Sequence, residues 1–407
     1  MIIVSRDLRP GADRIGHGRP EIASASYTPG MSRRLVAVTL TIALFGACGD
    51  EHEVCVLGDP NECDVREAEC IERLNALVVC MRGVEHPVPD YVVLTPEEEL
   101  AALPEPVVPD ADEAARAALY YDGLKLLRLL PQDWAPSYEK PTSVQEPFIR
   151  VQEDGSLRIV VDRSLPENEV RALLYALTFA HRSVEVDIEA LFDVATFDQG
   201  HALGSLLAGE SFFYANLGFE WSGGDPAVAE EFDFRGSVDF ARGWLADESV
   251  TFWDAMSIFD AYFGTYQAHQ DFIRGGQAAI DAAYEEQLGS TAHTLAGPHI
   301  EIEAAFSAVD TELPVLPDGF EYLFQNQFGP TVYHMHQLRM TGAFSRPDTE
   351  EAIARTWVGD RILFTGNLAS EQVAVVWQIA GSDGTVAETI IAASDAKTET
   401  SFRALFP

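Results

Sequence analysis

The stretch PENEVRALLYALTFAHRSVEVDIEAL, residues 166–191, decides the fold of this chain. Its apolar residues recur at helical spacing, so one face of the predicted helix is suited to burial. These residues are Val170, Leu173, Leu174, Leu177, Ala180 and Val184. Pro166 suits a first helical turn, and Ser164 is the expected N-cap. The pattern by itself predicts a core helix.

Six residues of this stretch also match, in register, the helix L-A-H-E-L-x-H-A-L-Q-D-Q-H-F-D-L-E-A-L; they are Leu177, Ala180, Asp187, Glu189, Ala190 and Leu191. The stretch therefore resembles the active-site helix of bacterial zincin-like metallopeptidases and their lipoprotein relatives. In this register the two zinc histidines fall on Tyr175 and Phe179, and the general-base glutamate falls on Ala176. Tyr175-Ala176-Leu177-Thr178-Phe179 thus stands where the family has H-E-x-x-H.

Further segments between about residues 115 and 393 resemble the same family in the same order. They are LLRLLPQDW (126–134), FIRVQEDGSLRIVVD (148–162), HALGSLLAGESFF (201–213), the block at 263–300, and ARTWVGDRI (354–362). The third resembles A-L-x-E-G-[DE]-A, whose first acidic residue is the third metal ligand. That position is Ala208 here, whereas Gly209 and Glu210 persist. The resemblance implies a zincin-like α+β domain over residues 113–407.

A zincin needs two histidines one helical turn apart to hold Zn²⁺ and a glutamate to deprotonate the metal-bound water. Tyr175 is a poor ligand, Phe179 offers no ligand atom, and Ala176 has no basic group. Ala208 removes the third carboxylate. We therefore expect no metal, no cofactor and no catalytic residue at this degenerate former site, whose residues are Tyr175, Ala176, Phe179, Ala208 and Glu210.

A displaced metal site is an alternative, built from His181 and Glu185 with His201 and Glu210. However, His181 lies six positions after Tyr175, about 240° around the helix, so it should face away from the former site. We expect His181 and Glu185 to form a solvent-facing pair.

Other candidate chemistry is weaker. His334 and His336 would share one side of an extended segment, but two ligands make a poor metal site. Several acids can be paired as acid–base candidates, namely Asp193, Asp198, Glu210 and Asp225, but a chain with 65 acidic residues contains such pairs by chance.

The N-terminal region reads as an export signal. Residues 1–30 look like a leader, and Met31 is the expected true start. Two arginines, the apolar run 35–45 and then Gly46-Ala47-Cys48 resemble a bacterial lipoprotein signal peptide ending at residue 47. A buried N-terminal strand is the alternative. Lipid on Cys48 would tether the protein to a membrane, and Gly49 in place of Asp favours the outer membrane.

Four further cysteines, Cys55, Cys63, Cys70 and Cys80, form an even set in a chain expected to be exported. This predicts two disulfides in a small module at 48–84, with three possible connectivities. A zinc site is the alternative, but no C-x-x-C pair is present.

The remaining pattern predicts α+β architecture. A Pro-rich, acidic linker spans 85–112, a helix covers 113–130, and Asp154-Gly155 marks a hairpin before the helix of residues 166–191. A helical region then reaches Tyr284. The C-terminal part is rich in strands, which we expect at 361–365, 373–379 and 386–392.

The net charge of −38 argues against nucleic acid as a partner. Together these features predict a non-catalytic exported lipoprotein on a metallopeptidase-like scaffold. It would bind a peptide or protein partner through the vacated cleft, or serve in envelope architecture. The alternative function is a metal-dependent hydrolase or peptidase with displaced ligands.

Overall fold

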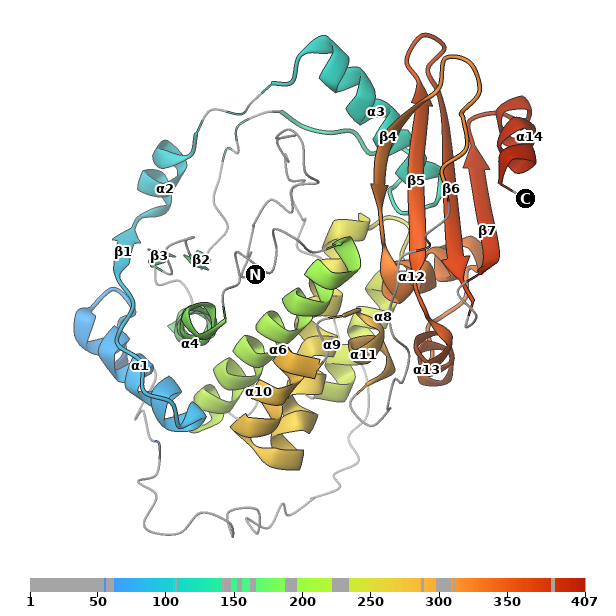
Figure 1. Cartoon of the computed structure of the whole chain (residues 1–407). Helices are drawn as coiled ribbons and strands as arrows, with labels where there is room; N and C mark the ends of the chain where they lie inside the picture. Colours follow the sequence, from blue (N-terminus) through green and yellow to red (C-terminus); the bar gives the residue numbers. More distant parts are fainter. Residues whose placement is uncertain are drawn as a thin grey trace, which may run out of the picture.

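The computed structural model combines helices and small sheets in an α+β architecture (Figure 1). It describes residues 55, 62–104, 106, 108–138, 140, 142, 148–151, 156–161, 166–186, 196–221, 234–286, 289–297, 309, 312–381 and 385–406. The leader at 1–47, Cys48, Ser164, the turn Asp154-Gly155 and the end of the 166–191 stretch lie outside these residues.

One side of the molecule is built around α4, Pro166–Glu185, the helix predicted from the 166–191 stretch. Its neighbours are α1 (Ala68–Arg82), α2 (Pro96–Ala102), β1 (Tyr91–Leu94), β2 (Phe148–Val151) and β3 (Leu157–Val160). The three strands form a sheet in the order β1-β3-β2, with β1 parallel and β2 antiparallel to β3. In Figure 1, α1 lies beside α4, and both contribute to one apolar core.

A group of helices occupies the centre of the molecule. They are α6 (Phe197–Trp221), α8 (Phe234–Ala246), α9 (Phe252–Gly275), α10 (Gln277–Glu286) and α11 (Ala292–Ala296). Helices α6 and α9 cross at Gly209 and Gly264, where a Cβ on Gly209 would lie 2.3 Å from the Gly264 backbone. This close approach requires glycine and fixes α6 against its neighbour.

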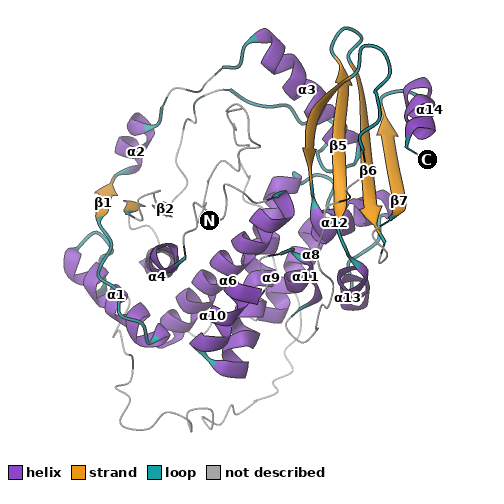
Figure 2. Cartoon of the chain, in the orientation of Figure 1, coloured by secondary structure: helices purple, strands orange, loops and turns teal. Residues whose placement is uncertain are grey.

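The other side carries a four-stranded antiparallel sheet in the order β4-β5-β6-β7 (Figure 2). Its strands are β4 (Glu321–Asn326), β5 (Asp360–Asn367), β6 (Gln372–Ala380) and β7 (Val386–Ala393). The accompanying helices are α3 (Ala111–Leu126), α12 (Gly329–Thr341), α13 (Pro347–Thr356) and α14 (Ala396–Leu405).

The two faces of this sheet pack against different helices because side chains alternate along a strand. Phe364 and Trp377 belong to the core that includes α3, α8, α9 and α12. Leu363 and Val376 face the other way and share a smaller core with Phe402 of α14. Burial on both faces explains why β6 is almost continuously apolar and why the centre of β5, Ile362–Phe364, is apolar as well.

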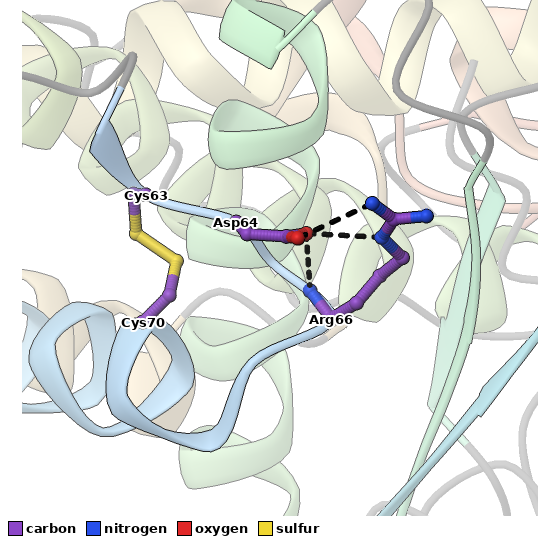
Figure 3. Close-up of a disulfide and its surroundings, with 4 residues drawn as sticks. All are labelled: Cys63, Asp64, Arg66 and Cys70. Carbon is purple, nitrogen blue, oxygen red and sulfur yellow. Dashed lines mark hydrogen bonds and ion pairs between the residues drawn. A yellow bond between two sulfur atoms is a disulfide. The ribbon is translucent and has the colours of Figure 1, made fainter.

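Two disulfides hold the region around α1: Cys55–Cys80 and Cys63–Cys70. The structure thus contains the two predicted bridges and selects one of the three possible connectivities. Cys63–Cys70 joins the residues before α1 to its first turn (Figure 3). Beside it, the Asp64 carboxylate accepts hydrogen bonds from the backbone and guanidinium of Arg66.

Several local predictions are confirmed. β2 pairs with β3 as the hairpin predicted at Asp154-Gly155 requires. Strands β5, β6 and β7 cover the three expected segments. The proposed division of the chain into module, linker and domain stays a prediction.

One local expectation is wrong. The helix expected at 113–130 ends at Leu126, because the chain turns at Arg128, whose φ is +56°. Leu129 and Leu130 follow the end of the helix but are still buried. Their apolar side chains therefore continue the helical pattern in the sequence past the true helix end. The condition under which His334 and His336 would share one side, an extended segment, is not met, because both lie on helix α12.

Candidate functional site

The positions that the resemblance assigns to a zinc motif lie in the core. Tyr175 is 2% exposed, Ala176 is fully buried, and Phe179 is 7% exposed. The Tyr175 and Phe179 rings stack at 6.2 Å between centroids, and Phe212 of α6 meets Tyr175 edge-on at 4.6 Å. Burial, followed by the nearby Asp260, raises the pKa of Tyr175, so the phenol stays neutral. Aromatic packing is therefore the role of these side chains.

Glu210, the acid that persists beside Ala208, lies fully buried on α6. Arg182 of α4 binds it with two N–H groups, each 2.8 Å from a carboxylate oxygen. The Arg82 Nε, from the end of α1, lies 3.2 Å from Oε1. Tyr284 donates to Oε2 at 3.0 Å, and Gln277 donates to Oε1 at 3.2 Å. Ala208 itself is half-buried on the same helix.

Glu185, whose side chain is 21% exposed, extends this group toward the surface; we define the charge cluster as Arg82, Arg182, Glu185 and Glu210. Its carboxylate lies 2.7 Å from Arg82 and 2.8 Å from Arg182. Burial opposes ionisation of Glu185, but the bond from Arg82 and the other cations nearby hold its pKa below the usual range. Two guanidinium groups thus compensate two carboxylates at the junction of α1, α4 and α6, as buried charges require.

The expectation for His181 is wrong in one respect. His181 does face α1 rather than Phe212, but it is 1% exposed and does not form a solvent-facing pair with Glu185. Its Nε2 lies 2.8 Å from Asn75 Oδ1, and its ring stacks on His86 at 4.6 Å. The sequence missed this because α1 and the segment after it cover the second face of α4.

His201 is not brought together with His181. Its Nδ1 lies 2.7 Å from Asp260 of α9, whose other oxygen accepts a bond from Ser205. The set His181, Glu185, His201 and Glu210 considered for a displaced metal is therefore divided between two places. Among the described residues, no three His, Cys, Asp or Glu side chains are grouped so as to hold a metal ion.

The histidines of α12 have separate partners. His334 Nε2 lies 2.6 Å from the Ser345 hydroxyl, and His336 Nδ1 lies 2.8 Å from the Leu127 carbonyl oxygen. Burial lowers the pKa of both imidazoles. They serve in packing α12 against neighbouring segments.

A hollow of about 330 Å³ lies where α6, β5 and the residues before α11 meet. It is lined by Asp198, Gln199, Gly289, Gln327, Trp357, Gly359 and Asp360. Two segments noted for their family resemblance, 263–300 and 354–362, therefore converge there. Of the four acids considered as acid–base candidates, Asp198 lies here and Glu210 in the charge cluster, while Asp193 and Asp225 lie outside the described residues.

Both carboxylates of the hollow hold backbone groups. Asp198 accepts bonds from the Thr291 amide and hydroxyl, at 3.0 and 2.6 Å. Asp360 accepts bonds from the backbone N–H groups of Phe328 and Gly329 and from Trp377 Nε1. Burial raises the pKa of Asp360 to about 7 against these donors, and Asp198 adds to the rise. We interpret the hollow as a structural junction.

No family model, curated protein or solved structure matches this chain. Within the described part of the chain, none of the helices is long and apolar enough to cross a membrane.

The charge cluster was missed at the sequence level because Arg82 and Arg182 belong to no motif. The only sequence signal for either residue is its position: Arg82 lies at the end of α1, and Arg182 follows His181 on α4.

Proposed function

We propose that this chain is a non-catalytic exported lipoprotein on a zincin-like, metallopeptidase-type scaffold. Its role is to bind a peptide or protein partner or to serve in the architecture of the cell envelope. The membrane attachment is lipid on Cys48, and the outer membrane is the expected location. The resemblance and the N-terminal signal support this role.

One observation carries the non-catalytic part of the proposal: the former motif on α4 consists of buried packing side chains. Tyr175 and Phe179 each expose 7% or less of their surface. A zincin instead needs an open coordination position for water and substrate. The filled positions also make entry of a partner at this point unfavourable, so the proposed partner contacts the surface elsewhere.

The acid at position 210 supports the same interpretation. A metal ligand or a general base needs a free oxygen, but both Glu210 oxygens accept charge-assisted bonds from Arg182. Arg82, Gln277 and Tyr284 add further donors. The acid therefore supplies fixed negative charge that holds α1 and α4 on α6.

Elemental analysis of the purified protein tests this proposal. We expect less than about a tenth of an equivalent of zinc, because positions 175 and 179 of α4 carry Tyr and Phe in place of imidazole ligands. General peptide substrates should remain uncut. Stoichiometric zinc that leaves with a chelator, together with loss of hydrolysis, would establish the alternative hydrolase with displaced ligands.

A restored motif tests the scaffold assignment separately. The variant Y175H/A176E/F179H/A208E replaces the four positions that the resemblance assigns to metal and base. If the register is right, the folded variant should bind Co²⁺ with a tetrahedral visible spectrum, whereas a control carrying only A176E and A208E should not. A folded variant without Co²⁺ binding would contradict the zincin-like register. The expected lack of zinc in the unmodified protein is a separate prediction and does not depend on this result.

A further inference from the structure

Segment 83–90 crosses α4 as an extended strap between α1 and β1. It leaves α1 at Gly83, whose φ of +67° reverses the chain direction without strain. At its other end, the Asp90 carbonyl accepts a bond from the Leu157 amide at 2.7 Å. Between these ends, the strap has no regular secondary structure. Its side-chain contacts therefore determine how strongly it is held against α4.

His86 contacts α4 directly. Its ring stacks on His181 at 4.6 Å with an interplanar angle of 20°. Its Nε2 lies 2.6 Å from Glu185, and its carbonyl accepts a bond from Asn75 at 3.2 Å. Only 12% of the His86 side chain is exposed, although Glu85 and Pro87 beside it are exposed. One imidazole therefore fixes the centre of the strap.

The tautomer of His181 follows from its partner. Asn75 donates its Nδ2 hydrogen to the His86 carbonyl, so its Oδ1 is the acceptor for His181 Nε2–H. The remaining nitrogen, His181 Nδ1, is buried without a hydrogen-bond partner. A proton added there would create a buried cation whose new N–H group has no acceptor, which is costly.

We propose that segment 83–90 is a proton-sensitive strap: protonation of His181 weakens the contact with His86 and lets the strap lift from α4. Lifting the strap removes the His86 contact from Glu185, whose side chain is already 21% exposed, and so gives water further access to the charge cluster. The charged and titratable groups around His181 are Arg82 on α1, His86 on the strap, Arg182 and Glu185 on α4, Glu210 on α6 and Asp281 on α10. This device does not depend on the proposed lipoprotein role.

The direction of the pH effect follows from the closed state. Burial, then His86 and Arg82, lower the pKa of His181 to about 3, while Glu185 opposes the shift. With the strap lifted, the pKa returns toward the ordinary value of about 6.5. The open form therefore binds the proton more readily, and acid favours it. Between pH 7.5 and pH 5 the opening constant should rise roughly 30-fold.

Hydrogen exchange of the strap amides in the full chain tests the proposal, after correction for the intrinsic pH dependence of exchange. We expect the roughly 30-fold rise in opening in the unmodified protein. The rise should be lost in H181Q, because glutamine keeps a donor for Asn75 and does not titrate. H334Q is the matched control, since His334 is equally buried but lies on α12; it should keep the full response.

An opening constant that is flat between pH 7.5 and pH 5, or one that rises equally in H181Q, would overturn the proposal. Loss of the response in H334Q would overturn it as well. If H181Q fails to fold, hydrogen exchange at the imidazole C2 positions of the unmodified protein provides the test, because its pH dependence reports the titration of each histidine. His181 must then titrate together with strap opening, and opening without a change at His181 would contradict the strap mechanism.

Discussion

At the scale of single residues, Phe179 is the clearest packing side chain among the positions that the resemblance assigns to metal ligands. It is 7% exposed on α4 and stacks on Tyr175. Changing Phe179 to Ala should lower the free energy of unfolding by about 3–5 kcal/mol, because a packed aromatic site is emptied. Urea unfolding followed by circular dichroism measures this.

The matched control is Phe344→Ala. Phe344 is 83% exposed in the loop after α12, so its truncation should change stability by less than about 0.5 kcal/mol. An equally small effect at Phe179 would mean that the ring does not fill the core, and the packing interpretation of the former motif would be wrong.

The residue scale also shows where sequence patterns stop being informative. Helical spacing identifies Leu173, Leu174 and Leu177 as core residues, and all three are buried. The same pattern treats Arg182 as surface, but it is 5% exposed and binds Glu210. Burial of a charge depends on a partner from a distant element, and a single sequence without contacts contains no sign of that partner.

At the scale of elements, α1 depends on covalent as well as apolar contacts. Cys55–Cys80 fixes its last turn and Cys63–Cys70 its first. Intact mass under non-reducing conditions should show the loss of four hydrogens. Peptide mapping should then recover these two pairs, because no rearrangement is needed once α1 is folded.

A reduced sample is the control for that measurement, since it must regain the four hydrogens. Four free thiols in protein exported to an oxidising compartment would contradict both the disulfides and the inferred compartment. A different pairing would contradict the arrangement of the chain around α1.

Elements with strong local signals were predictable. Helix α4 has its amphipathic period, β6 is an apolar run that ends before Gly381, and β5 has an apolar centre that ends before Gly366. Strand β4 gave no comparable signal, because it lies at the edge of the sheet with a mixed burial pattern. The end of α3 was misplaced because burial continues past Leu126 while the backbone turns.

At the scale of the whole molecule, two apolar cores meet along the central helices. One surrounds α4 with α1 and α6, and the other lies between the helices and the β4–β7 sheet. The α+β class was predictable from the order of helical and strand-like segments. The packing of α1 on α4 was not predictable, because the contact between them joins Asn75 to His181, which are 106 residues apart.

The proposed attachment of the molecule to a membrane through Cys48 gives the last prediction. Cys48 follows an apolar run and two small residues, and seven positions later Cys55 is bridged to Cys80. Lipid on Cys48 would therefore hold the end of α1 close to the bilayer, with each buried CH₂ contributing about 0.8 kcal/mol to anchoring. Changing Cys48 to Ala should abolish incorporation of a fatty-acid analogue in metabolically labelled cells. A Cys80→Ala variant should keep the label, because that cysteine serves only the disulfide, and undiminished label on Cys48→Ala would refute acylation at this position.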